Sequence, residues 1–578
     1  MATEADFVPV ASLAALKADG TTIVSHHGRS VALFYHEDQV YAVDNRCPHM
    51  GFPLSKGTVD EGVLTCHWHH ARFELSCGDT FDPWADDVQT FPVRVEGDDI
   101  LIDPDPEPTV PPATHWRNRL ADGLQENLRL VIAKAVIGLA DEGEDVAVPI
   151  KTGVDFGTKY RDAGWGSGLT VHAAMANILP ALSDVDQKRA LYTGLRYVAN
   201  DAAGEPPRFE QPGFTTTDVS KDRLKTWFRE TIEVRDNDPS ERTLRTAIGT
   251  LSPEEVAEIM YTAATDHRYL NAGHSFDFVN KAFEVLDHIG WENAPNVLPT
   301  LVDELTGATR SEELSSWRQP IDVAGLLSEA YDNLDEMVAT GAGKTWEEPA
   351  DFTETLLADD PHAIVDALVE AVKSGATTTE LAHAVSIAAM RRVAHFGTAN
   401  EFTDWNTVHH TFTYANAVEQ ATRRTDATEL YRGIFDGAIS VYLDRFLNMP
   451  PAPLPEPGES DADPAEIRAR LMDVFDEEGE VNKAATLVSE HFDADGDPTE
   501  LMQTLGEALL REDANFHTLQ NLEACFKQFE VAESESEKRL ALMTVARYMA
   551  AHFPTRREAE QTFTIASRLH RGEKIYEA

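Results

Sequence analysis

The chain has 578 residues, a formal net charge of −50 at pH 7 and four cysteines. So acidic a protein repels nucleic acid and anionic membranes, and four cysteines are too few for a disulfide framework. The acidic composition, with 15 Lys against 34 Arg, predicts a protein of a salt-loving organism. The sequence has no basic or apolar leader and no apolar run of about 18 residues, so we expect the protein in the cytoplasm.

Residues 7–102 have the pattern of β-strands. Stretches such as TTIVSHHGRSVALFYHEDQVYAVDN and VQTFPVRVEGDDILIDP combine short apolar runs with turn residues. Five prolines follow within residues 103–115, and proline extends neither a sheet nor a helix. We therefore expect a small β-domain over residues 1–102 and a proline-rich linker over residues 103–115.

Two Cys-His motifs lie inside this β-domain. The first is Cys47-Pro-His49, and the second is Cys66-His-Trp-His69. Two thiolates and two imidazoles can hold a tetrahedral zinc ion. Because each motif contributes one Cys and one His, the set better suits an iron–sulfur cluster in which the thiolates bind one iron and the imidazoles bind the other. Cys77 lies outside both motifs and is expected to be a structural or incidental thiol.

The motifs CPHMG and CHWHHARFEL, together with residues 5–102 around them, resemble a Rieske [2Fe–2S] domain of the ferredoxin type. This resemblance implies that Cys47 and Cys66 bind one iron of the cluster. It also implies that His49 and His69 bind the other iron.

The sequence departs from the respiratory form of that family at four positions. Phe52 and Trp68 stand where that form has a disulfide, and Ala71 and Phe73 stand where it has hydroxyl donors. Fewer donors stabilise the reduced cluster less, so we expect a reduction potential low in the Rieske range. Such a carrier suits the delivery of electrons to an oxygenase or a reductase.

From residue 116 onward, apolar residues recur at helical spacing. DPHAIVDALVEAVKSG, for example, has Asp before and Gly after an i, i+3, i+4 pattern. Six prolines in residues 449–464 interrupt the helical region. We expect helical domains over residues 116–448 and 465–578. The predicted fold class is α+β multidomain: a small all-β Rieske domain followed by a large all-α domain of helical-hairpin repeats.

Similar stretches recur within the helical region. HSFDFVNKAFE begins at His274, and HTFTYANAVEQ begins at His410. AHFGT precedes the second copy, and AHFPT precedes a third copy, QTFTIAS. The similarity predicts repeated hairpins with a histidine near the start of one helix.

Helix-borne histidines are the candidates for a second metal site. His274 and His410 occupy matched positions of the repeat, and His172 and His267 are further candidates. Singly, each of them is better explained as a buried core histidine, but together they suit a mononuclear Fe(II). Asp266-His267 followed by His274 does not match the ligand spacing of ring-hydroxylating oxygenases, so that type of catalytic domain is not expected.

The helical region, through HSFDFVNK and HTFTYANA, resembles the questin oxidase-like family of all-helical proteins that oxidise polycyclic aromatics. The resemblance implies an iron bound by several histidines and a modified lysine. His274 and His410 are then the first candidates for its ligands. His172 and His267 come next, and Lys281 is the candidate lysine.

These observations predict an oxidoreductase. Its [2Fe–2S] cluster passes electrons to a histidine-bound iron oxygenase that acts on a small organic substrate. The sequence has no GxGxxG motif, so the expected electron donor is a separate NAD(P)H- or flavin-dependent reductase or a ferredoxin. The alternative is a non-catalytic Rieske electron carrier whose helices dock a partner enzyme. A homo-oligomer is compatible with both.

Overall fold

The computed structural model describes residues 7–26, 28–215, 218–447, 449–573 and 575. Contacts divide the chain into two compact units, the first made of residues 1–152 and 560–578 and the second of residues 153–559. The predicted domain ends at residues 1, 448 and 578 lie outside the described residues. The first unit thus includes helical residues from both ends of the helical region.

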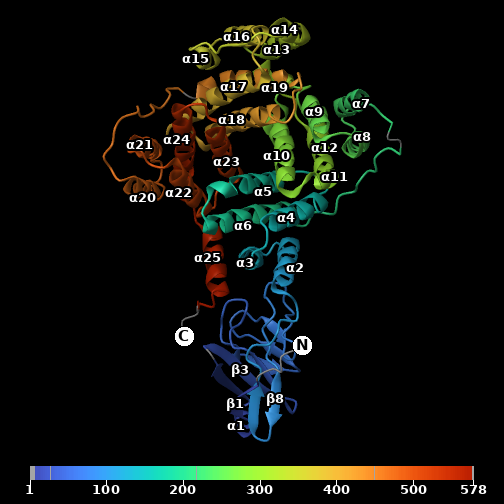
Figure 1. Cartoon of the computed structure of the whole chain (residues 1–578), viewed down its shortest axis with the longest axis vertical. Coiled ribbons are helices and arrows are strands. Elements are labelled where there is room, and N and C mark those ends of the chain that lie inside the picture. The colour runs from blue at the N-terminus through green and yellow to red at the C-terminus, as the bar shows by residue number, and fades with distance from the viewer. Residues whose placement is uncertain (1–6, 27, 216–217, 448, 574, 576–578) are drawn as a thin grey trace. The chain divides into compact units, whose positions relative to one another are not determined.

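The β-domain contains nine strands among the described residues. They are β1 (Val8–Ser12), β2 (Thr21–His26), β3 (Arg29–His36), β4 (Gln39–Asp44), β5 (Thr58–Asp60), β6 (Val63–Thr65), β7 (Arg72–Glu74), β8 (Val93–Glu96) and β9 (Asp99–Ile102). They form three antiparallel sheets, with strand orders β1-β9-β8, β2-β3-β4 and β5-β6-β7 (Figure 1). A short helix that the sequence did not predict, α1 (Leu13–Asp19), follows β1 and is capped by Ser12.

Two small hydrophobic cores hold these sheets. One core gathers Leu64, Phe73 and both cysteines of the Cys-His motifs, and the other lies around Leu16 and Ile100. Valine, leucine and phenylalanine on alternate positions of the strands supply the buried faces. The first motif follows β4, and the second follows β6. The cysteines of both motifs lie in the same hydrophobic core.

All further elements are helical, as predicted. The described residues contain α2 (Pro112–Gln125), α3 (Arg129–Asp141), α4 (Ala147–Lys159), α5 (Ser167–Ile178), α6 (Asp184–Asp201), α7 (Lys221–Glu233), α8 (Asn237–Thr250), α9 (Pro253–Ala264), α10 (His274–Ile289), α11 (Ala294–Val297), α12 (Val302–Gly307), α13 (Val323–Asp332), α14 (Leu334–Gly341), α15 (Phe352–Leu356), α16 (Pro361–Lys373), α17 (Thr378–Ala394), α18 (Phe402–Thr422), α19 (Leu430–Leu443), α20 (Pro464–Val474), α21 (Val481–Asp493), α22 (Pro498–Leu510), α23 (Phe516–Val531), α24 (Glu535–His552) and α25 (Glu558–His570). This arrangement confirms the predicted fold class of a small β-domain followed by a large helical region.

Residues 103–111 and 449–463 form neither helix nor strand, so α2 begins inside the predicted linker. None of the described helices combines the length and the apolar character that crossing a bilayer requires.

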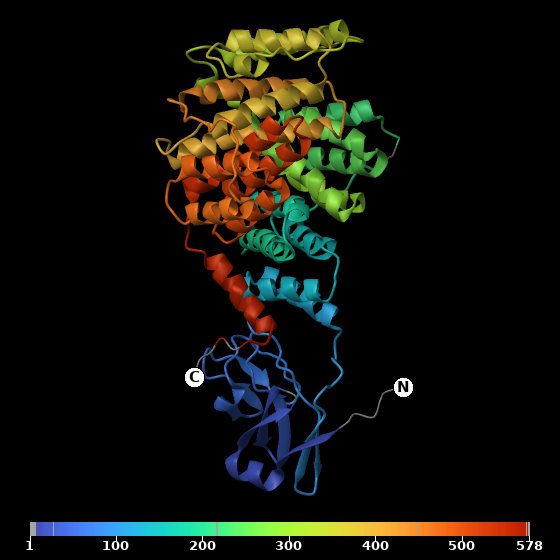
Figure 2. The ribbon, with the colours of Figure 1, turned by 60° about the vertical axis from the view of Figure 1, so that its left-hand side comes forward.

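The second unit is built from helices that pack in pairs. α5 packs on α6, α17 on α18 and α23 on α24. Figure 2 shows stacked helices in this part of the chain. α18 also contacts both α10 and α23. These three helices, which are far apart in the sequence, therefore meet in the interior of the unit.

The predicted repeat is correct for His274 and wrong for His410. His274 is the first residue of α10, directly after Gly273 in a left-handed conformation. His410 lies in the third turn of α18, because Glu401 and Asp404 form a capping box that starts this helix at Phe402. The sequence similarity therefore does not mark two helix starts.

Candidate metal centres

The two Cys-His motifs lie in loops of the same geometry. In the first loop, the amide of Gly51 donates to the carbonyl of Cys47 at 2.7 Å. In the second loop, the amide of His70 donates to the carbonyl of Cys66 at 3.0 Å. Gly51 and His70 both have left-handed φ angles, 81° and 64°, which glycine adopts freely and other residues adopt rarely. Each loop is thus a single tight turn that begins at its cysteine.

The two thiols lie together in the core of the β-domain. Cys47 and Cys66 are 2% and 1% exposed, are not joined by a disulfide and hydrogen-bond to each other through sulfur. This hydrogen bond lowers the pKa of Cys66 to about 6, against the effect of burial, and raises the pKa of Cys47. Backbone amides of Trp68 and His69 donate to Cys66 and lower its pKa further. The loops are therefore arranged to stabilise negative charge on sulfur.

The two imidazoles complete the donor set. The rings of His49 and His69 meet edge to face, with centroids 4.9 Å apart. Burial, followed by the charges of His69 and Lys134, lowers the pKa of His49 to about 4. Nδ1 of His49 is buried and has no hydrogen-bond partner. A neutral imidazole with an unpaired buried nitrogen suits a metal ligand, and the set fits both zinc and a Rieske cluster.

A second group of metal-ligating side chains lies in the helical unit. His274 of α10, His410 of α18 and His517 of α23 each offer a ring nitrogen, and these nitrogens all lie within 4.8 Å of one another. Nε2 of His410 is 2.8 Å from Nε2 of His517. All three residues are half-buried. Imidazole triads of this kind bind divalent iron, copper, nickel or zinc.

The three imidazoles are neutral at physiological pH. Burial lowers the pKa of His274 to about 4. Burial and the neighbouring histidines lower the pKa of His410 to about 3 and that of His517 to about 4. A histidine that binds a metal must be deprotonated. The lowered pKa values therefore leave all three rings in the form that can bind a metal cation.

A strained turn positions His274. Tyr269, Asn271 and Ala272 all have left-handed φ angles, between 42° and 54°, directly before the helix. Asn271 holds the turn by donating to Glu304 at 2.6 Å and by accepting from the amide of Thr309 at 2.8 Å. Left-handed conformations at non-glycine residues persist only where surrounding contacts fix them, and they cluster at functional sites.

His517 was not among the residues predicted from the sequence. The signal that points to it is a His-Ser/Thr pair: His517-Thr518 matches His274-Ser275 and His410-Thr411. Asn515 caps α23 by accepting from the amide of Thr518, and this places His517 in the first turn of the helix.

His172 and Lys281 do not lie in this group. His172 is 1% exposed and packs between Gly153 and Gly194, where an added Cβ would lie within 2.6 Å of its ring nitrogens. Lys281 is 1% exposed and forms two ion pairs of 2.8 Å. Its partners are Glu284 and Glu523. Both residues have contacts that account for their burial, and their role as iron ligands stays a prediction.

His267 also lies outside the group. Its Nε2 pairs with Glu233 at 2.5 Å, and its Nδ1 pairs with Glu312 at 2.6 Å. Burial lowers the pKa of His267, but the hydrogen bonds to Glu312 and Glu233 outweigh burial and raise it above the ordinary value. His267 is therefore an ion-pairing residue in this structure.

The ion pairs of His267 should stabilise the protein in a pH-dependent way. Because its folded pKa is raised, the stabilisation is fully present below the unfolded pKa of about 6.5 and is lost as the pH rises through the folded value. His267→Gln should lower stability by about 1 kcal/mol near pH 6 and by less near pH 9. Melting temperatures of variant and wild type at both pH values test this. An equal difference at both pH values would contradict it.

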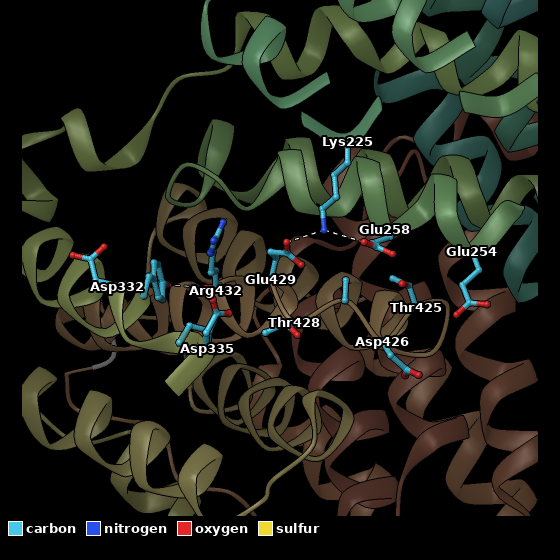
Figure 3. Close-up of a pocket in the computed structure, with 13 residues that line it drawn as sticks. Lys225, Glu254, Glu258, Asp332, Asp335, Thr425, Asp426, Thr428, Glu429 and Arg432 are labelled. Atoms are coloured by element: carbon cyan, nitrogen blue, oxygen red, sulfur yellow. Dashed lines mark hydrogen bonds and ion pairs between the residues drawn. The ribbon is translucent and has the colours of Figure 1, made fainter. Parts of the chain in front are cut away.

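A cavity of about 520 Å³ has none of the three histidines in its lining. It is lined by two basic residues and six acidic ones, with Lys225 reaching between Glu258 and Glu429 (Figure 3). Because its lining includes neither histidine nor cysteine, it does not add to the metal-ligating groups.

Comparisons with known proteins concern the β-domain. The Rieske [2Fe-2S] domain family matches residues 6–92. The ferredoxin component of the naphthalene 1,2-dioxygenase system of Pseudomonas aeruginosa is 32% identical over 81 residues, which are 14% of this chain and 78% of that protein. Mouse apoptosis-inducing factor 3 is 37% identical over 73 residues, 12% of each chain. The match therefore spans only a small part of that relative.

One solved structure is also similar to part of this chain. The ferredoxin of carbazole 1,9a-dioxygenase from Nocardioides aromaticivorans is 31% identical, and the alignment covers 17% of this chain and 98% of that one, with a TM-score of 0.17. The family match ends at residue 92 and does not reach the helical region, so the resemblance to questin oxidase-like proteins stays a prediction. Through residues 6–92, the chain belongs to the Rieske [2Fe–2S] domain family.

Proposed function

We propose that this protein is an oxidoreductase in which a Rieske cluster supplies electrons to an iron bound by His274, His410 and His517. The observation that supports the proposal most is the convergence of three neutral imidazoles from three helices, in a chain that also contains a Rieske domain. A Rieske domain and a group of metal-ligating histidines in one chain would suit an oxygenase.

Cys47, His49, Cys66 and His69 would hold the [2Fe–2S] cluster. When bound, the cluster supplies one-electron transfer. The free, buried thiols and the unpaired Nδ1 of His49 support this assignment. The backbone amides at Trp68 and His69 would stabilise negative charge on sulfur. His69 and Trp68 are exposed, so an external reductase can approach this ligand.

The three histidines would hold Fe(II), which supplies chemistry on O₂ when bound. The chain itself offers a proton on the helix that carries His274. Asp277 lies one turn after His274, is 1% exposed, and accepts a hydrogen bond from Nε2 of Gln520 at 2.5 Å. Burial raises the pKa of Asp277 to about 7, so this carboxyl can hold and release a proton near neutral pH. Gln520 lies one turn after His517 and keeps Asp277 oriented.

Nitric oxide tests the proposed iron directly. Protein reconstituted anaerobically with Fe(II) should give the EPR signal of a high-spin ferrous nitrosyl on addition of nitric oxide, since an open Fe(II) site binds it. His410→Ala protein should lack this signal and keep the signal of the reduced Rieske cluster. A wild-type protein without any nitrosyl signal would rule out an accessible Fe(II) in the helices.

The second candidate function is a Rieske electron carrier whose helices dock a partner enzyme. The observation that favours it is the similarity of 81 and 79 residues of this chain to ferredoxin components of two oxygenase systems. In this case the three histidines would be structural. Their substitution would then change stability without changing the iron content.

We propose the compartment and the ionic strength in which the protein works from its cysteines and its net charge. The four described cysteines are free thiols, which fits the reducing cytoplasm. A net charge of −50 on 578 residues favours a protein that folds at high ionic strength, where counterions screen self-repulsion. We also propose a small organic substrate, a separate reductase or ferredoxin as electron donor, and a homo-oligomer as one form of assembly.

A further inference from the structure

A buried lysine from outside the Rieske match reaches the cluster-binding loop. Lys134 lies in the middle of α3, whose residues 131–139 are all buried, and is itself 5% exposed. Its Nζ donates to the carbonyl of Pro48 at 2.5 Å and to that of His49 at 3.5 Å. The same Nζ pairs with Asp86 at 2.9 Å. A cation is thus fixed against the backbone of one proposed cluster ligand.

A second basic residue from the helices joins this network. Nε of Arg119, in α2, donates to Asp86 at 2.8 Å, and its Nη2 donates to the carbonyls of Pro83 and Ala85. Between these two carbonyls lies Trp84, whose ring packs edge-on against His49 with centroids 4.6 Å apart. Side chains of α2 and α3 therefore hydrogen-bond to the loop that contains His49 and to the loop that contains Trp84.

The buried network has an excess of one positive charge. Lys134, Arg119 and Asp86 are all less than 10% exposed. Asp122, which also pairs with Arg119, has a side chain that is 53% exposed and is screened by solvent. Two buried cations therefore share one buried anion. The effective dielectric constant is lower for buried charges than for surface charges, so a buried excess charge acts more strongly on groups several ångströms away.

We propose that Lys134 raises the reduction potential of the Rieske cluster. Reduction adds one electron from an external donor, and therefore one negative charge, to the cluster. A fixed cation beside the ligand loop stabilises this reduced form more than the oxidised form. Through Lys134, helix α3 would thus raise the reduction potential of a cluster whose domain has Ala71 and Phe73 in place of hydroxyl donors. The proposal rests on the proposed cluster ligands and is independent of the second iron.

The test is a redox titration of the full-length protein at one fixed pH, followed by EPR, with dithionite as the reductant. Lys134→Met should make reduction about tenfold less favourable, which for one electron is a potential lower by about 59 mV. Asp86→Asn removes a negative charge from the same network and should shift the potential upward. Acid-labile sulfide, measured on each variant, shows separately whether the cluster is bound.

The matched control is Lys17→Met. Lys17 is exposed and lies on α1, beside the other hydrophobic core, so this equal change of charge should leave the potential unchanged. Opposite shifts in the Lys134 and Asp86 variants support the proposal, because a loosened loop would move both variants in the same direction. If the Lys134→Met protein loses the cluster, the reduction potential of the Asp86→Asn protein tests the proposal by itself. An unchanged or lowered potential in Asp86→Asn overturns the proposal.

Discussion

Replacing His517 by alanine is expected to remove the iron of the helical unit and to leave the Rieske cluster in place. His517 supplies one of three nitrogens within 4.8 Å of one another, and its Nε2 faces that of His410 at 2.8 Å. Two imidazoles alone hold a divalent ion far more weakly than three. Iron per chain should therefore fall from about three to about two, while acid-labile sulfide stays at about two.

The control for this variant is His362→Ala, which makes the same substitution at an exposed histidine of α16. It should keep both the iron and the sulfide of the wild type. A His517→Ala protein that retains its third iron, with its fold intact by circular dichroism, would refute the proposed ligand set.

Replacing Cys66 by serine is expected to abolish the [2Fe–2S] cluster. The hydrogen bond from Cys47, followed by backbone amides, lowers the pKa of the Cys66 thiol to about 6, so a thiolate forms readily here. A serine hydroxyl stays protonated in the same place and is a poor ligand for iron. The variant should lose about two irons, about two sulfides and the visible absorption of the cluster.

Cys77→Ser is the matched control for this second variant, because Cys77 is an exposed free thiol after β7. Its cluster content should equal that of the wild type. If Cys66→Ser retained labile sulfide at the wild-type level, Cys66 would not be a cluster ligand. If the wild type bound zinc without sulfide, the zinc alternative would be correct.

The sequence revealed the first site because the site is local. Cys47, His49, Cys66 and His69 lie in two short turns of one small domain, and their spacing fixes their geometry. The position of His274 near a helix start was also predicted, and it is the first residue of α10, directly after Gly273. What the sequence did not reveal is the left-handed turn at residues 269–272, which Asn271 holds through its contacts with Glu304 and Thr309.

The second site was only partly predictable because it is assembled across the helical unit. His517 is 107 residues from His410 in the sequence, and nothing local indicates that α23 packs beside α18. For the same reason, His267 seemed a candidate ligand, although its acidic partners 34 and 45 residues away give it another role. The contribution of Lys134 to the cluster loop likewise spans 86 residues.

The most direct test of the account is the iron and acid-labile sulfide content of the full-length protein, purified anaerobically at high salt and supplied with Fe(II). The account predicts about three irons and about two sulfides per chain, with the EPR signal of a reduced Rieske cluster. About two irons and about two sulfides, with nothing further bound, would contradict a histidine-bound iron in the helices and favour the electron carrier.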